Sequence, residues 1–338
     1  MLAIQSLPEQ RGGCVNLFGM HDSLPAFEDV LSAAARIAPH ARVTPVLQSH
    51  ALDALTGAQL HFKAEHLQRV GAFKFRGACN AVWSLDDEAA RAGVVTHSSG
   101  NHGAALALAA RTRGIACHVV VPEGAVATKV ASIQRYGATI HTCAATITAR
   151  EDTCAQVQRD TGAELVHPYA DARVIAGQGT AALELLNAVA GLDVLVVPVG
   201  GGGLAAGTAI ATAALAPACE VVLAEPEGAA DTARSLAAGE RRVDFIPDTV
   251  CDGLRGTLGA PNFELLRNHR AQVITVSDAD TLQAMRLLWQ ITKQLVEPSS
   301  AIALAAVLQQ RERFEGRRVG IILSGGNVDL DALPWSKP

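Results

Sequence analysis

The chain has 338 residues, of which 49% are hydrophobic and 18% charged, with a formal net charge of −5 and a pI near 6.1. This length suggests two domains, or one large α/β unit with a second lobe. The net negative charge offers no positive surface potential to attract nucleic acid or anionic lipid. The aromatic content of 4% offers few side chains on which bases could stack. We therefore expect neither a nucleic-acid partner nor a membrane partner.

The cysteines indicate a reducing compartment. The seven cysteines are odd in number and contain no Cys-x-x-Cys pair, which argues against a disulfide framework or a structural zinc site. No apolar run reaches the length of a membrane span without interruption, and the N-terminus lacks the pattern of a secretory signal. We expect a cytoplasmic protein.

In chain order, residues 1–24 come first; their hydrophobic residues follow no clear period, and we expect them to form an arm. Residues 25–38 predict an amphipathic helix. Short β-rich runs then begin at residues 94, 116, 138, 193, 220, 272 and 318. Helical patterns between them cover 101–113, 126–137, 180–191 and 278–295, and a polar stretch at 227–248 is expected on the surface.

This alternation predicts an α/β protein with twisted, mostly parallel sheets flanked by helices. Ligands of such sheets bind where the carboxyl ends of strands meet the amino ends of helices. Four short motifs occupy such positions or lie close to them in the pattern.

The first motif is "GAFKFRG" at 71–77, in which Lys74 lies between two phenylalanines. Such a lysine either lays its stem on apolar surface or is a desolvated amine. Desolvation lowers a lysine pKa and populates the neutral, nucleophilic form. The heptapeptide alone favours neither alternative.

The second motif, "HSSGNHG" at 97–103, follows an expected strand and opens an expected helix. Serine and asparagine are ordinary helix caps, but two adjacent serines exceed what one cap requires. The backbone amides at this helix start would suit a carboxylate.

The third motif, "VPVGGGGLAAG" at 197–207, predicts a loop whose amides wrap a phosphate. Gly201, Gly203 and Ala206 also fit a relaxed dinucleotide fingerprint, with Glu225 as the ribose-binding acid. An NAD-dependent oxidoreductase is therefore an alternative. It ranks lower because it leaves Lys74 and the 97–103 motif without a role.

The fourth motif, "LSGGNVD" at 323–329, is either a tight turn after a strand or a site where Ser324 meets a buried heteroatom. The four motifs fit one ligand that has an aldehyde, a phosphate and a heteroaromatic ring. Pyridoxal phosphate has these three groups.

In this order the motifs resemble those of fold-type II pyridoxal-phosphate enzymes, which are similar to the tryptophan synthase β subunit. Within that group the chain looks most like serine racemase and the serine/threonine dehydratases. The resemblance covers about residues 25–330 and implies a large cofactor-binding domain (25–90 and 170–332), a small domain (91–169) and a homodimer.

The resemblance also implies roles for individual residues. The cofactor contacts would be Lys74 as the Schiff-base lysine, Phe73 beside the ring, Asn101 at the phenolic oxygen, Ser324 at the pyridine nitrogen, and Gly200, Gly201, Gly202, Gly203 and Leu204 at the phosphate. The substrate carboxylate would meet Ser98, Asn101 and His102.

Ser99 matches the second acid/base group of the racemases, on the face of Cα opposite Lys74; inversion needs such a pair. The alternative is a turn or cap serine. Glu225, the carbonyl of Ala229, and Asp231 match a Mg²⁺ or Ca²⁺ site, for which the alternative is two solvated surface acids.

Three departures from the family pattern, Ala72, Tyr169 and Gly256, concern the substrate side. Arg150 is either a solvated helix charge or a bidentate partner for a second substrate carboxylate. In the second case 3-hydroxyaspartate becomes a candidate substrate.

The sequence therefore predicts an enzyme that dehydrates serine- and threonine-type amino acids to a 2-keto acid and ammonia, with serine racemase activity alongside. A 3-hydroxyaspartate ammonia-lyase, the oxidoreductase above, and a non-catalytic cofactor carrier are the alternatives.

Overall fold

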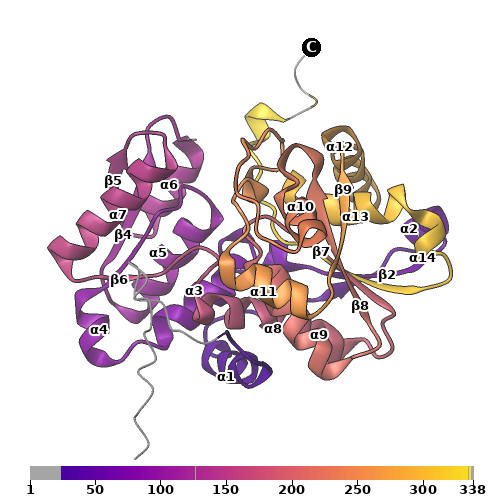
Figure 1. Cartoon of the computed structure of the whole chain (residues 1–338), viewed down its shortest axis with the longest axis horizontal. Coiled ribbons are helices and arrows are strands. Elements are labelled where there is room, and N and C mark those ends of the chain that lie inside the picture. The colour runs from indigo at the N-terminus through magenta and orange to yellow at the C-terminus, as the bar shows by residue number, and fades with distance from the viewer. Residues whose placement is uncertain (1–23, 126, 334, 336–338) are drawn as a thin grey trace, which may run out of the picture.

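The structure, a computed structural model, describes residues 24–125, 127–333 and 335. The expected arm at 1–24 therefore lies outside the described residues, except for Leu24. The molecule contains two separate sheets with helices packed around them (Figure 1). The smaller sheet lies on the left of Figure 1 and the larger on the right.

The larger sheet has six strands in the order β1 (Val46–Leu47), β2 (Gln59–Lys63), β10 (Arg318–Ile322), β7 (Val194–Pro198), β8 (Glu220–Pro226) and β9 (Gln272–Val276). Only β1 runs antiparallel to its neighbour. The smaller sheet has four parallel strands in the order β5 (Thr139–Cys143), β4 (Cys117–Pro122), β3 (Val94–Thr96) and β6 (Glu164–Leu165). The predicted α/β class with mostly parallel sheets is confirmed.

The helices connect the strands and cover both sheets. They are α1 (Phe27–Ile37), α2 (His50–Thr56), α3 (Lys74–Trp83), α4 (Asp87–Ala92), α5 (Asn101–Arg113), α6 (Ala127–Arg135), α7 (Ile147–Thr161), α8 (Ala172–Ala188), α9 (Gly203–Leu215), α10 (Asp231–Ala238), α11 (Ala260–Asn268), α12 (Asp278–Leu287), α13 (Pro298–Gln309) and α14 (Arg311–Phe314). In the part of the chain that the structure describes, no helix is long and apolar enough to cross a membrane.

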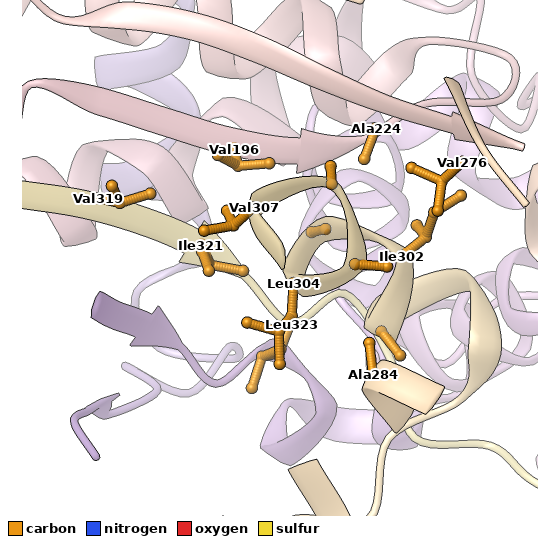
Figure 2. Close-up of a cluster of buried hydrophobic side chains, with 14 of the residues drawn as sticks. Val196, Ala224, Val276, Ala284, Ile302, Leu304, Val307, Val319, Ile321 and Leu323 are labelled. Atoms are coloured by element: carbon orange, nitrogen blue, oxygen red, sulfur yellow. The ribbon is translucent and has the colours of Figure 1, made fainter. Parts of the chain in front are cut away.

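The main core of the larger sheet forms around α13, which is apolar on every side. Its residues 301–307 are at most 1% exposed. Figure 2 shows Ile302, Leu304 and Val307 of this helix among apolar side chains of the larger sheet. Burying each such side chain contributes about 1.5–3 kcal/mol. The first turn of α13 is therefore held in place, and this turn follows Glu297 and contains Ser299.

Most of the expected elements are confirmed, although the helix expected at 180–191 is α8, which begins earlier, at Ala172, and ends at Ala188. All seven expected strands form, and α5 has the expected bounds. The helix expected at 278–295 is wrong beyond Thr292, because α12 continues as one π-helical stretch that ends at Lys293 with φ +60°. The stretch at 227–248 is only partly a surface segment, since it contains α10 and the fully buried Asp231. The strands β1, β2 and β6 were not expected.

The candidate site lies at the carboxyl ends of strands from both sheets. The turn at 97–100 follows β3, the glycine loop follows β7, and residues 323–327 follow β10. Helix α3 packs against α5 near the smaller sheet and against α8 near the larger one. The predicted division into a large and a small domain agrees with the two sheets and stays a prediction.

Candidate active site

Lys74 lies at the start of α3, beside the chain that follows β10. The N–H of Phe73 donates to the Ser324 carbonyl at 2.9 Å, and Ala72 forms a bridge with Gly325. The Lys74 amine donates to the Pro168 carbonyl at 2.9 Å and lies 5.1 Å from the centre of the Phe73 ring. Burial lowers the pKa of Lys74 to about 8, although Glu297 opposes this shift. Of the two alternatives for this lysine, the structure favours the desolvated amine.

The glycine loop is packed so tightly that side chains are excluded. A Cβ on Gly200 would come within 2.7 Å of the Leu254 backbone, and one on Gly201 within 2.4 Å of the Tyr169 ring. Gly202 has φ +91°, which favours glycine. The loop leads directly into α9, whose first amides have no partner within the helix. This arrangement suits an anion such as a phosphate.

Ser324 is buried, at 3% exposed, after the end of β10. Its hydroxyl donates to the Ser299 carbonyl at 3.4 Å, a long and therefore weak bond. The side chain thus retains hydrogen-bonding capacity for a heteroatom. The bonds of Phe73 and Ala72 to the Ser324–Gly325 segment bring it close to Lys74.

The turn at 97–100 places both serines, half-buried, before α5. The Ser98 hydroxyl accepts from the Gly100 N–H at 3.4 Å, as an ordinary turn serine does. Among the described residues, no protein group is hydrogen-bonded to the Ser99 hydroxyl. Among these residues Ser99 thus makes no capping hydrogen bond, and its role as a proton-transfer group stays a prediction.

Asn101 is held at both ends of its amide. Its Nδ2 donates to Glu297 at 2.9 Å, and its Oδ1 accepts from the Asn327 side chain at 2.9 Å. His102 is only 2% exposed, and its Nε2 contacts the Val166 carbonyl at 3.3 Å. Burial holds the pKa of His102 well below its usual range. The His102 ring is thus neutral and held by a protein carbonyl, so it is not expected to form an ion pair with a substrate carboxylate.

Glu297 was not expected as a site residue. It is 4% exposed and accepts from Asn101 and from the Asn327 N–H, the latter at 3.0 Å. Burial raises its pKa, while Lys129 and Lys74 lower it. A Cβ on Gly325 would lie 2.5 Å from a Glu297 oxygen, which explains that glycine of the fourth motif. A lone acid before a proline gave no sequence signal.

Three further side chains, His97, His167 and Tyr169, gather around the turn whose Pro168 carbonyl accepts from the lysine. The ring centres of His97 and His167 are 5.2 Å apart, and those of His167 and Tyr169 are 4.6 Å apart. Burial, with help from Arg150, lowers the pKa of His97 to about 4. Burial raises the pKa of Tyr169, and Arg150 opposes this. The charge of Arg150, on α7, thus acts on both side chains, and its role facing the site stays a prediction.

Glu225 and Asp231 are fully buried, so they are not solvated surface acids. The Glu225 oxygens accept from the N–H groups of Thr232 and Ala233 at 2.7 and 2.8 Å. One Asp231 oxygen accepts from the Leu258 N–H at 2.8 Å, and the other is buried without a partner. Burial raises the pKa of Glu225 to about 7 and that of Asp231 to about 6.

These features fit a hard cation. A buried carboxylate oxygen without a partner is costly, and coordination to Mg²⁺ or Ca²⁺ would offset that cost. No cluster of three His, Cys, Asp or Glu side chains able to hold a metal occurs in the described residues. Backbone oxygens such as the Ala229 carbonyl would have to complete the coordination.

Comparison with known proteins decides among the chemical alternatives. A family model described as "Pyridoxal-phosphate dependent enzyme" matches residues 37–325. The chain belongs to this family. It is 50% identical to the β-hydroxyaspartate dehydratase of Paracoccus denitrificans over 93% of this chain and 99% of that protein.

Two serine racemases are also similar to this chain. The protein from Arabidopsis thaliana is 47% identical over 90% of this chain and 95% of its own length. The crystal structure of the Dictyostelium discoideum enzyme superposes with a TM-score of 0.87 at 46% identity, covering 90% of this chain and 99% of that one. The family resemblance predicted from the motifs is confirmed, and the oxidoreductase alternative is removed.

The residues present fit the family's cofactor. Lys74 supplies a desolvated amine, the tight glycine loop supplies amides at the start of α9, and Ser324 supplies a weakly engaged hydroxyl. All three lie at the carboxyl ends of strands or beside them. Their roles as individual contacts stay predictions.

Proposed function

We propose that this enzyme dehydrates small β-hydroxy amino acids of the L-serine and L-threonine type to a 2-keto acid and ammonia, with serine racemase activity alongside. The observation that carries the proposal is the buried Lys74 amine, with a pKa of about 8, whose acceptor Pro168 adjoins the Tyr169 ring that packs on Gly201 of the glycine loop. The named activities of the similar proteins, a hydroxyaspartate dehydratase and serine racemases, support the same reaction class.

Bound pyridoxal phosphate would supply an electron sink for the substrate Cα. Lys74 would hold the cofactor and, when released as a free amine, remove the Cα proton. Over the whole reaction the substrate would lose its Cα proton and β-hydroxyl as water, and the released enamine would tautomerise to an imine that water hydrolyses to the 2-keto acid and ammonia. Near pH 8 about half of such an amine is neutral and can accept a proton.

Racemisation needs a second proton-transfer group on the opposite face of Cα, and we assign this role to Ser99. Its unengaged hydroxyl supports the assignment. Ser98 and Asn101 would bind the substrate carboxylate. For His102 the engaged ring favours a contribution through its backbone amide at the start of α5.

A second candidate substrate, 3-hydroxyaspartate, is favoured by the position of Arg150. The charge of this arginine lowers the pKa of His97 and opposes the rise in the pKa of Tyr169, so its electrostatic influence extends to both side chains. A guanidinium there could bind a second carboxylate in a bidentate manner. The name of the Paracoccus relative gives independent support.

We also propose that Glu225, Asp231 and the Ala229 carbonyl bind Mg²⁺ or Ca²⁺, supported by the unpartnered Asp231 oxygen. The homodimer and the cytoplasmic location remain proposals that follow from the resemblance and from the cysteines. The six described cysteines are free thiols, as is typical of a reducing compartment.

An absorbance scan of the purified protein before and after addition of L-serine and Mg²⁺, with pyruvate assayed in the same sample, tests the proposal. We expect a band near the edge of the visible range, together with pyruvate. Lys74→Ala should remove both, with a loss of activity of about 10³-fold or more. A carrier protein would keep the band but produce no keto acid from L-serine or 3-hydroxyaspartate, which would contradict the proposal.

A further inference from the structure

The turn at 167–170, "HPYA", joins the lysine to the glycine loop. The Pro168 carbonyl accepts the Lys74 amine at 2.9 Å. The Tyr169 ring lies so close to Gly201 that a Cβ there would come within 2.4 Å of it. The Asn262 amide ties the same two segments together, because it donates to the Tyr169 and Gly201 carbonyls at 2.9 and 2.6 Å. The geometry of this turn therefore affects both predicted contacts with the cofactor.

His167 holds the turn through one ring nitrogen. Its Nδ1 accepts from the Ala170 N–H at 3.1 Å and from the Tyr169 N–H at 3.4 Å. An Nδ1 that accepts these bonds carries no proton, so the proton of the neutral ring lies on Nε2. Burial, with His97 and Lys74 adding to it, lowers the pKa of His167 to about 3. The ring thus stays neutral, and the turn stays closed, throughout the ordinary pH range.

We infer that His167 is a positioning residue, whose Nδ1 closes the 167–170 turn and thereby fixes the carbonyl that holds Lys74 and the ring that packs on the glycine loop. The inference rests on the proposed function, in which Lys74 is the reacting amine. A neutral amine that donates one N–H to Pro168 has its lone pair directed elsewhere, which makes it available as a base.

A histidine suits this place better than the residues that usually close such turns. Asparagine and aspartate can accept the same two N–H bonds, as in an Asx turn. An aspartate, however, would place a negative charge close to Lys74. The imidazole also fills space between His97 and Tyr169, whose ring centres lie 5.2 and 4.6 Å from its own.

Two substitutions in the full-length holoenzyme separate these contributions. His167→Asn keeps an acceptor for the turn but removes the ring, whereas His167→Leu keeps much of the volume but removes the acceptor. His50→Leu, at a fully exposed histidine of α2, is the control. The fraction of pyridoxal phosphate retained after dialysis and the split between kcat and KM for L-serine are measured for each protein.

We expect His167→Leu to lose cofactor at least about tenfold faster and to lower kcat about tenfold with KM nearly unchanged, since the altered contact is with Lys74. His167→Asn should recover most of both. Equal impairment of the two variants, or no impairment in His167→Leu, would overturn the inference. If His167→Leu does not fold, His167→Gln, whose amide is too long for the same turn, provides the contrast.

Cofactor retention is measured without turnover, so it separates this inference from the proposed function. A wild-type protein that holds pyridoxal phosphate but forms no keto acid would contradict the proposed reaction. The retention ratio between His167→Asn and His167→Leu would still decide the role of the turn.

Discussion

The glycine loop at 200–203 and the serine turn at 97–100 both follow a buried strand and precede a helix, yet they are packed differently. A Cβ on Gly201 would lie 2.4 Å from an aromatic ring, while one on Gly100 would meet nothing within 4 Å. The glycine loop offers backbone groups in a tightly filled space, where they are predicted to bind the cofactor phosphate. The serine turn offers half-buried side chains in an open space.

The difference teaches how one scaffold can keep its cofactor while its substrate varies. Backbone amides in a packed loop are indifferent to the substrate and hard to alter by substitution. Side chains at the open turn and on α7 can be exchanged with little effect on packing, so they are where specificity is expected. Three predictions test this contrast, and a fourth concerns the buried acids; they are given in order of decreasing expected effect.

Removal of the Ser99 hydroxyl should have the largest selective effect. Ser99→Ala is expected to lower the racemisation of L-serine about 10³-fold, because the proton donor on the second face is lost. Elimination needs only Lys74 and should stay within about threefold of wild type. D-serine and pyruvate are measured in the same reaction. Ser98→Ala, the matched variant, should instead raise KM for both reactions. If Ser99→Ala lowered the rates of racemisation and elimination equally, the assignment of Lys74 and Ser99 to opposite faces of Cα would be refuted.

Arg150→Ala tests whether Arg150 binds a second carboxylate of the substrate. We expect kcat/KM for 3-hydroxyaspartate to fall about 10²-fold, the usual cost of removing one partner of a hydrogen-bonded charge pair. The value for L-serine should change little. Arg159→Ala, at an exposed position of the same helix, is the control. A parallel loss on both substrates would show that Arg150 has a structural role only.

Gly201→Ala and Gly100→Ala compare the two packings directly. The first is expected to weaken cofactor binding about 10-fold to 100-fold, because forced overpacking costs about 1–3 kcal/mol. The second should leave cofactor binding unchanged, since its Cβ enters open space. Equilibrium dialysis of pyridoxal phosphate measures both. Similar affinities in the two variants would mean that the Tyr169 ring moves aside at little cost.

The same contrast explains which parts of the fold could be predicted from the sequence. Strands β7, β8 and β10 are apolar runs buried on both faces, and such runs are easily recognised. Strand β2 was missed because it contains His61 and Lys63, and the latter is buried in an ion pair with Glu184. The sequence does not show that partner, 121 residues away.

In the candidate site, the glycine loop and Lys74 were found because unusual residues stand next to each other in the chain. Glu297, His167 and Asn262 were missed because each acts alone through contacts that only the fold creates. Tyr169 was noted as a departure from the family pattern, but its contact with Gly201 could not be foreseen. Motifs thus predict groups that lie close in the sequence, while isolated polar residues need the structure.

The smallest expected effect concerns the buried acids. Burial raises the pKa of Glu225 from 4.5 to about 7 and that of Asp231 from 3.8 to about 6. An acid with a raised pKa binds more protons in the folded state than in the unfolded state. The stability of the metal-free protein should therefore fall as the pH rises from about 4 to about 7.

A cation binds the deprotonated acids, so Mg²⁺ should offset this loss over the same pH range. We expect Mg²⁺ to raise Tm by a few degrees at pH 8 and by almost nothing at pH 5, where protons already occupy the acids. Scanning calorimetry with Mg²⁺ or with a chelator measures the difference. Asp231→Asn keeps an acceptor for Leu258 but removes the charge, and it should abolish the gain at pH 8. An equal gain at both pH values, or one that persists in Asp231→Asn, would place the cation elsewhere and return Glu225 to a purely local role as the acceptor for the first amides of α10.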